Sequence, residues 1–515
     1  MNCLIGTDIG TSGTKSIVMD TTGKLLASDL QEYDVLTPKP LWAEQWPQVW
    51  VEAVTASIRE AVKKAGVKPT DVKGICISGL YGGSGIPLDE KMEPVGPCLI
   101  WMDRRATDEE QWVLEHVGEE RLQKITHNGA DPYYGFTKIL WMKHKQPGKW
   151  AQTKLFLPPN AYAIYKLTGE IAIDYSSAGN IGGIFDMNTR SWSHELLDAM
   201  GIPSTMMPQR LVECTQIVGV LHQEGAALLG LPEGIPVLNG GVDCGAATVG
   251  LGVFQPGVYA AAIGTSMCAA LIHEKPIKGR GLIEWPYLVD SKRLSYSFGG
   301  GATAGALIKW FRDNFARWEK QVEDEGGKNA YAVLDEEAEQ LPPGSEGILV
   351  LPYFMGERSP VWDTHAKGVI FGLSLSHTRA HVYRAFLEAV AYSLRHTMEC
   401  TGEDLGEQIL LAGGVAKSKL WRQIFADVTG SSVVCPKSDV EANLGDVMLA
   451  GVGTGLLSWQ DISAWQVLDT KVLPNPEAHA AYNHYYQLYH RIYGNLKEDM
   501  KTLTKLGQSQ TMTHA

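Results

Sequence analysis

Short apolar runs interrupted by glycine and threonine open the chain. Residues 3–10 (CLIGTDIG) and 16–20 (SIVMD) predict two strands joined by a tight turn, and residues 21–27 (TTGKLLA) predict a turn into a third strand. Residues 46–66 place Val49, Ala53, Ile58 and Val62 at roughly helical spacing and end at Gly66. Residues 72–80 (VKGICISGL) predict another strand. The chain therefore begins with a meander, a helix and a strand.

The same succession returns in the second half of the chain. Residues 257–272 (GVYAAAIGTSMCAALI) again predict strand, Gly-Thr-Ser turn, strand. Residues 234–252 and 408–430 each predict a strand that passes through glycines into a helix. We interpret this as a degenerate internal repeat, which predicts two related α/β domains facing a cleft. The expected domains are residues 1–247 and 248–490, followed by 491–515 as the end of a C-terminal helix and a tail.

Composition narrows the class of protein. With 515 residues, 44% hydrophobic and 20% charged, the chain is long enough for two large domains. The net charge of −13 argues against nucleic acid as a partner. The eight cysteines show no C-x-x-C pair, and the longest apolar run, residues 258–272, is shorter than the ~20 residues that span a bilayer. We therefore expect a cytoplasmic protein without a membrane segment.

The first predicted hairpin gathers groups that bind phosphate. Asp8 precedes a turn with Gly10, Thr11 and Gly13, and Lys15 follows it. Backbone N–H groups, hydroxyls and one cation at a single point suit phosphate oxygens, and glycine allows close approach. Asp, Gly and Thr are also ordinary hairpin residues. The second copy of the turn, at residues 264–266 (GTS), favours phosphate binding.

Asp243 ends an apolar strand and precedes a predicted helix, which directs it toward an interdomain cleft. A carboxylate there can act as general base toward a substrate hydroxyl. Asp is also among the best helix N-cap residues, and the sequence alone leaves both roles open.

Aromatic and polar residues alternate in several segments of the first half. Trp42 and Trp101 lie close in sequence to acids and amides, a mixture found in sugar sites, although each Trp could equally be a core residue. The fourteen histidines lack metal-binding spacing, so a protein-held transition metal is not expected.

These motifs together resemble the FGGY family of carbohydrate kinases, within the superfamily of sugar kinases, actin and the seventy-kilodalton chaperones. IGTDIGTSGTK is similar to the family's first phosphate motif, GGVDCG to the stretch with its catalytic aspartate, AAIGTS to its second phosphate loop, and LLAGGVAKSKLWRQIFADVTG to its adenosine motif. KILWM from Lys138, LPYFMGERSPVWD, and GVIFGLSLSHTRAHVYRAFLE from Gly368 match further family signatures. The resemblance implies two ribonuclease H-like (actin/hexokinase superfamily) α/β domains flanking a cleft.

The resemblance also implies roles for individual residues. ATP and Mg²⁺ are the expected cofactors, with Asp243 as the base and Asp8 organising Mg²⁺ through water. The expected phosphate-binding residues are Gly10, Thr11, Lys15, Gly264 and Thr265. The expected adenosine-binding residues are Gly305, Lys309, Gly414 and Ser418. On the substrate side, the expected residues are Glu44, Gln45, Tyr81, Gly82, Asp103, Tyr133 and Asp243.

The acceptor is less closely specified. Tyr81 and Gly82 stand where xylulose kinases carry Met-His and glycerol kinases carry Arg-Glu, and Cys244 replaces the amide that usually follows the catalytic aspartate. We predict ATP-dependent phosphorylation of a small sugar or polyol, foremost a ketopentose such as xylulose. Glycerol-like or gluconate-like acceptors, tetroses and other polyols remain alternatives, as does an actin-like or chaperone-like ATPase without an acceptor. Self-association as a homodimer is left open.

Overall fold

A computed structural model describes residues 1–515 except 81, 275–276, 278–280, 403–405, 438–440 and 513–515, with only the backbone described at 507–512. The first half is built on a six-stranded sheet in the order β13-β14-β5-β1-β2-β3. Its strands are β1 Cys3–Ile9, β2 Gly13–Asp20, β3 Leu25–Glu32, β5 Val72–Gly79, β13 Ile217–Val220 and β14 Pro236–Val242. The predicted opening meander is confirmed, because β1, β2 and β3 pair antiparallel in sequence order.

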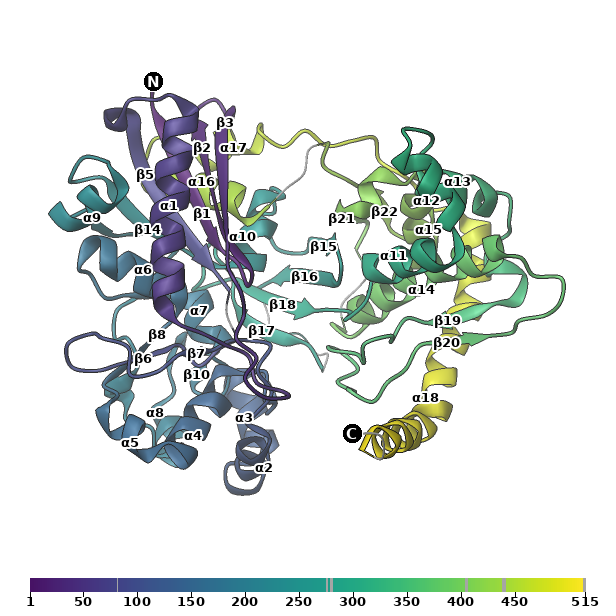
Figure 1. The fold of residues 1–515 in the computed structure, drawn as a ribbon, viewed down its shortest axis with the longest axis horizontal. Helices are drawn as coiled ribbons and strands as arrows, with labels where there is room; N and C mark the ends of the chain where they lie inside the picture. Colours follow the sequence, from purple (N-terminus) through teal and green to yellow (C-terminus); the bar gives the residue numbers. More distant parts are fainter. Residues whose placement is uncertain (81, 275–276, 278–280, 403–405, 438–440, 513–515) are drawn as a thin grey trace.

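The second half repeats this arrangement, as Figure 1 shows. Its sheet has the order β17-β18-β16-β15-β21-β22. The strands are β15 Tyr259–Ile263, β16 Met267–His273, β17 Ile283–Pro286, β18 Ser295–Gly299, β21 Gln408–Gly413 and β22 Ser432–Val434. β15 pairs antiparallel with β16 and parallel with β21, just as β1 pairs with β2 and β5. The internal repeat read from the sequence thus corresponds to two sheets of the same local topology.

Helices pack against the sheets through their apolar faces. α1 (Pro47–Ala65) ends at Gly66, which adopts a left-handed conformation (φ 65°) that glycine tolerates well. α14 (Arg379–Glu399) is almost wholly buried in the second core. α11 (Gly305–Phe315) and α15 (Lys419–Thr429) begin beside the glycine turns of the second sheet. The helix predicted near the end of the chain is α18, Pro476–Met512.

Two helices pack against each other beside the first sheet. α10 (Asp243–Gly250) follows β14 directly, and α16 (Ala442–Gly453), although late in the sequence, lies beside β1 and β5 (Figure 1). The helices cross closely, since a Cβ on Gly445 would lie 1.9 Å from the Ala246 carbonyl oxygen. Glycine at this position therefore lets α16 reach the strand ends that carry Asp8 and Ser78.

The remaining elements form the outer parts of each half. In the first half they are β4 Glu44–Gln45, β6 Ile86–Leu88, β7 Cys98–Leu99, α2 Thr107–His116, α3 Glu119–Thr126, α4 Gly135–Lys145, α5 Pro147–Gln152, β8 Leu155–Leu157, α6 Pro159–Thr168, β9 Ile173–Asp174, α7 Tyr175–Asn180, β10 Phe185–Asp186, β11 Ser191–Trp192, α8 His194–Met200, β12 Leu211–Val212 and α9 Gln223–Leu229. In the second half they are α12 Arg317–Asp324, α13 Ala330–Glu339, β19 Leu349–Leu351, β20 Val369–Phe371 and α17 Trp459–Ser463. Among the described residues, no helix combines the length and apolar character needed to cross a membrane.

Candidate active site

The first glycine turn joins β1 to β2 and presents Asp8 at the end of β1. The Gly10 N–H donates to the Gly13 carbonyl oxygen at 2.9 Å, and the Tyr33 hydroxyl donates to the Gly10 carbonyl oxygen at 2.7 Å. Asp8 faces Lys15 across the hairpin in register. The hairpin therefore places a carboxylate and a cation on neighbouring strands. The turn beside them is fixed by the hydrogen bond from Tyr33.

Asp8 lies near the end of β1, and Asp243 follows β14 directly as the first residue of α10. Burial raises the pKa of Asp8 to about 7, and repulsion by Asp243 adds to the rise. Burial likewise raises the pKa of Asp243 to about 6. Asp243 is the first residue of α10 and accepts from the Cys244 N–H at 2.6 Å, while the N-cap position belongs to Val242. The N-cap alternative for Asp243 is therefore wrong, and its action as a base toward a substrate hydroxyl stays a prediction.

Lys15 forms an ion pair with Glu441, which stands immediately before α16. Lys15 is about one third exposed and Glu441 half exposed, so solvent screens their attraction. Sequence patterns gave no sign of this pair because 426 positions separate its members.

The second glycine turn joins β15 to β16 and is packed against α11. The Gly305 N–H donates to the Gly264 carbonyl oxygen at 2.8 Å, and the Ala306 N–H donates to the Thr265 carbonyl oxygen at 3.1 Å. A Cβ on Gly305 would lie 2.5 Å from the Gly264 oxygen, so glycine is needed for this contact. Lys309, one turn further along α11, is mostly exposed and pairs with Asp313 at 2.5 Å.

Two of the predicted adenosine residues, Gly414 and Ser418, follow β21. Gly414 follows Gly413, whose φ of 89° is accessible mainly to glycine. Ser418 caps α15: its Oγ accepts from the Trp421 N–H at 3.0 Å and donates to Asp335 Oδ2 at 2.7 Å. The Ser418 hydroxyl thus already has a structural role, and its contact with adenosine stays a prediction.

Two side chains from the first half hold Thr11 in the first glycine turn. The Trp101 indole N–H donates to Thr11 Oγ1 at 3.0 Å, and the Gln45 amide donates to the Thr11 carbonyl oxygen at 3.0 Å. Trp101 also lies under the guanidinium of Arg358 from the second half, whose carbon is 5.9 Å from the ring centroid. Arg358 belongs to the LPYFMGERSPVWD signature, but its contact with Trp101 was not predicted from the sequence.

Glu44 and Asp103 are drawn together by one arginine. Arg105 Nη2 donates to Glu44 Oε2 at 2.7 Å, and Arg105 Nε donates to Asp103 Oδ2 at 2.8 Å. Asp103 is fully buried and also accepts from the Ala43 N–H. The Arg105 guanidinium carbon lies 3.6 Å from the Trp42 ring centroid. These side chains form an internal network, and direct contact of Glu44 or Asp103 with a substrate stays a prediction.

Gly82 and Tyr133 meet at a wall beside Trp101. A Cβ on Gly82, where φ is 87°, would lie 3.0 Å from the Tyr133 hydroxyl and 3.0 Å from the Trp101 Cβ. Lys138 is buried and donates to the Gly82 and Tyr133 carbonyl oxygens, which fixes both backbones. Burial lowers the pKa of Lys138 to about 7. The predicted substrate residue Tyr81 lies outside the described residues.

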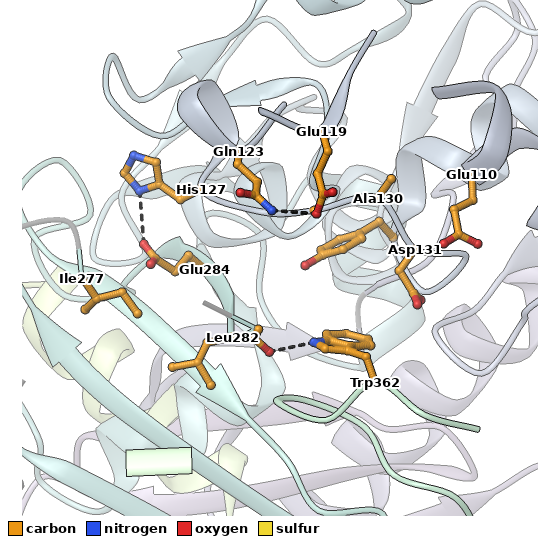
Figure 2. Close-up of a pocket in the computed structure, with 13 residues that line it drawn as sticks. Glu110, Glu119, Gln123, His127, Ala130, Asp131, Ile277, Leu282, Glu284 and Trp362 are labelled. Atoms are coloured by element: carbon orange, nitrogen blue, oxygen red, sulfur yellow. Dashed lines mark hydrogen bonds and ion pairs between the residues drawn. The ribbon is translucent and has the colours of Figure 1, made fainter. Parts of the chain in front are cut away.

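A cavity of about 580 Å³ opens between the two halves, and Figure 2 shows its walls. Four of its lining side chains are carboxylates, namely Glu110, Glu119, Asp131 and Glu284. Asp131 pairs with Arg104, whose guanidinium carbon lies 5.9 Å from the Tyr133 ring centroid, and His127 lies 3.2 Å from Glu284. The cavity therefore adjoins the Tyr133 wall and has an acidic lining.

Family comparisons agree with this geometry. Residues 3–250 match the model of the N-terminal domain of the FGGY family of carbohydrate kinases, and residues 259–454 match that of its C-terminal domain. The xylulose kinase of Lactococcus lactis subsp. lactis is 30% identical over 97% of this chain and 98% of its own length. The gluconokinase of Bacillus licheniformis is 30% identical over 89% of each chain.

A solved structure supports the same conclusion. The crystal structure of xylulose kinase from Rhodospirillum rubrum superposes with a TM-score of 0.88 at 27% identity and covers 97% of this chain and 100% of its own. The expected actin/hexokinase-like fold is confirmed, and the kinase interpretation replaces the alternative of an ATPase without an acceptor. With both domain models matched along the chain and the two glycine turns built on equivalent strands, this protein belongs to the FGGY family of carbohydrate kinases, which use ATP to phosphorylate a small sugar.

Proposed function

We propose that this protein transfers the γ-phosphoryl group of ATP to a hydroxyl of an uncharged ketopentose, with D-xylulose as the foremost acceptor. The observation that carries the catalytic part is the position of Asp243, which begins α10 and lies close enough to Asp8 to perturb its pKa. With a pKa of about 6, Asp243 is ionised above neutral pH and can accept the proton of the attacking hydroxyl.

The nucleotide would lie between the two glycine turns. Thr11, Lys15 and the turn amides on the first side, and Gly264 and Thr265 on the second, would hold its phosphates. Such a site needs little covalent chemistry from the protein, since positioning and charge stabilisation carry phosphoryl transfer. Lys15 would exchange its Glu441 partner for phosphoryl oxygens. Gly305, Lys309, Gly414 and Ser418 would border the adenosine.

The donor chemistry fits Mg²⁺. Asp8 and Asp243 are partly buried carboxyl groups that repel each other, so a divalent cation near Asp8 would relieve the unfavourable charge. Within the described part of the chain, no group of three or more His, Cys, Asp or Glu side chains could enclose a metal. Mg²⁺ is usually held by one or two carboxylates together with substrate phosphates and water, where it neutralises charge on the transferred group. Asp8 would hold it here.

An uncharged acceptor is favoured over an aldonate by the electrostatics of the cavity. Four of the thirteen described lining residues carry carboxylates and none is Lys or Arg; of the four, Asp131 is paired with Arg104. A negatively charged acceptor would be repelled on approach, whereas a neutral ketose would not. Similarity to xylulose kinases over almost the whole chain points the same way.

The test is a coupled ADP-release assay with saturating Mg-ATP and a panel of D-xylulose, D-ribulose, glycerol, erythritol and D-gluconate. We expect the highest kcat/KM with D-xylulose and at least 10-fold less with D-gluconate at low ionic strength. Higher kcat/KM for D-gluconate would exclude the ketopentose assignment. ATP hydrolysis of equal rate with and without every acceptor would exclude the acceptor site.

We also propose a cytoplasmic location. All eight cysteines are free thiols, as is usual in a reducing compartment, where ATP is also supplied.

A further inference from the structure

Helix α16 carries a buried acid that the mechanism above does not use. Asp446 lies in the largely apolar stretch ANLGDVMLAGVG and has no exposed surface. A buried carboxyl group is unfavourable unless hydrogen bonds satisfy it. The groups that contact the Asp446 carboxyl group should therefore explain its presence in this helix.

The Asp446 carboxyl group fits a space prepared by the sheet. Asp446 Oδ2 lies 2.8 Å from Ser78 Oγ, and Oδ1 lies 3.8 Å from Cys76 Sγ. Gly240 of β14 leaves the room, because a Cβ there would lie only 2.0 Å from Asp446 Oδ1. The carboxyl group is thus seated between β5 and β14, at the strand ends next to Asp8.

Ser78 connects Asp446 to Asp8. Ser78 is fully buried, stands opposite Asp8 in the parallel pairing of β1 and β5, and has its Oγ 3.4 Å from Asp8 Oδ1. A serine hydroxyl has one hydrogen and can donate to only one carboxyl group at a time. If Asp446 donates to Ser78 Oγ, the Ser78 hydrogen remains for Asp8.

The protonation state of Asp446 agrees with that direction. Burial, together with repulsion by Asp8, raises the pKa of Asp446 well above its ordinary value. A neutral carboxylic acid is a hydrogen-bond donor, and Ser78 Oγ lies within hydrogen-bond distance of both Asp446 and Asp8.

We propose that Asp446 is a positioning residue for the metal-binding carboxylate: it orients the Ser78 hydroxyl so that Ser78 donates to Asp8 and keeps Asp8 ready to bind a divalent cation. This inference rests on the proposed role of Asp8 in holding Mg²⁺. It connects α16, which comes late in the sequence and packs against the first sheet, to the proposed metal site.

The test measures metal binding rather than turnover. Mn²⁺ binding to the complex of the full-length protein with ADP is titrated by electron paramagnetic resonance. We expect Asp446→Ala and Ser78→Ala each to weaken Mn²⁺ binding about 10-fold, the scale of a hydrogen bond to a charged group. The double variant should be no weaker than either single variant, because both changes remove one relay. Asp446→Asn keeps a donor for Ser78 and should bind within about 3-fold of the unaltered protein.

Cys76→Ala is the matched control, since it removes a different side-chain contact of Asp446 and leaves the Ser78 hydroxyl in place. Its Mn²⁺ affinity should be unchanged. Unchanged Mn²⁺ affinity in Ser78→Ala would overturn the relay even if Asp446→Ala failed to fold, and so would additive losses in the double variant. Asp8→Asn separates the two proposals. If it binds Mn²⁺ normally, the metal role of Asp8 is wrong, whereas a loss there with Ser78→Ala unaffected would refute only the inference on Asp446.

Discussion

The indole nitrogen of Trp101 donates a hydrogen bond to the hydroxyl of Thr11 at 3.0 Å. The contact joins the wall formed by Gly82, Tyr133 and Trp101 to the first glycine turn, and the two bonded residues are 90 positions apart in the sequence. A shift of the Trp101 ring would therefore also move the Thr11 hydroxyl.

We therefore expect Trp101→Phe, which retains the ring face but loses the N–H, to lower kcat about 10-fold. The reason is that Thr11 loses one of the two contacts that orient it, and misplacement of phosphate-binding groups slows transfer. Steady-state kinetics by ADP release measure the effect. Trp112→Phe, on α2 and stacked on His116, is the matched control and should retain full activity. Equal kcat in the Trp101 variant would show that the hydrogen bond is dispensable.

Removing the proposed base should separate catalysis from nucleotide binding. Asp243→Asn should lower kcat by roughly 10²- to 10⁴-fold, because the amide cannot accept the proton of the acceptor hydroxyl. Affinity for Mg-ADP, measured by calorimetry, should stay within about 3-fold. Near-normal turnover in this variant would eliminate Asp243 as the base.

The pH dependence of kcat should follow the same group. With a pKa of about 6, Asp243 is protonated and inactive as a base below that pH, so the rate should rise with pH and level off above about 7. A profile that is flat between pH 5 and 8 would contradict this assignment.

Asp8 should make the nucleotide-free protein less stable as pH rises. Its native pKa of about 7 exceeds the ordinary 3.8, so the native state holds the proton more tightly than the unfolded chain. The free energy of unfolding contributed by Asp8 is therefore largest below pH 4 and is lost as pH rises toward 7. Asp8→Asn should remove this loss and raise Tm at pH 8 by roughly 2–5 °C, as measured by calorimetry. A lower Tm at pH 8 would show that Asp8 is not strained in the free protein.

The ion pair of Lys15 with Glu441 should compete with nucleotide binding. Glu441→Gln should lower the KM for Mg-ATP by about 2- to 5-fold at low salt, a range suited to a partly exposed pair, and the effect should shrink at 0.5 M salt. Asp108→Asn, which breaks the exposed pair with Lys145, should leave KM unchanged. A higher KM in Glu441→Gln would mean that Glu441 orients Lys15 productively.

Ser418→Ala should lower the stability of the protein more than its affinity for Mg-ATP. The Ser418 hydroxyl caps α15 and donates to Asp335, so its loss should cost about 1–2 kcal/mol in the free energy of unfolding. Urea denaturation measures this. A change in Mg-ATP affinity without any change in stability would instead place the hydroxyl on the nucleotide.

The local sequence pattern was enough to predict the two hairpins and two of the candidate site residues. The hairpins of residues 3–20 and 257–272 were predictable because strand alternation and glycine turns act over a few residues, and the repeat of this unit indicated two similar sheets. Asp8 and Asp243 could be singled out for the same reason, since Asp8 lies next to the last residue of a buried strand and Asp243 directly follows another.

Tertiary structure decided which partners those residues have. Glu441 reaches Lys15, and Asp446 reaches Ser78, across 426 and 368 positions, and no local periodicity encodes such contacts. Similarly, Glu44 and Asp103 have the chemistry of sugar ligands, yet Arg105 occupies their carboxylates in the folded chain. The physical reason is that hydrogen bonds and burial depend on what the fold brings within 3 Å, whereas the sequence displays only the order in which groups are joined.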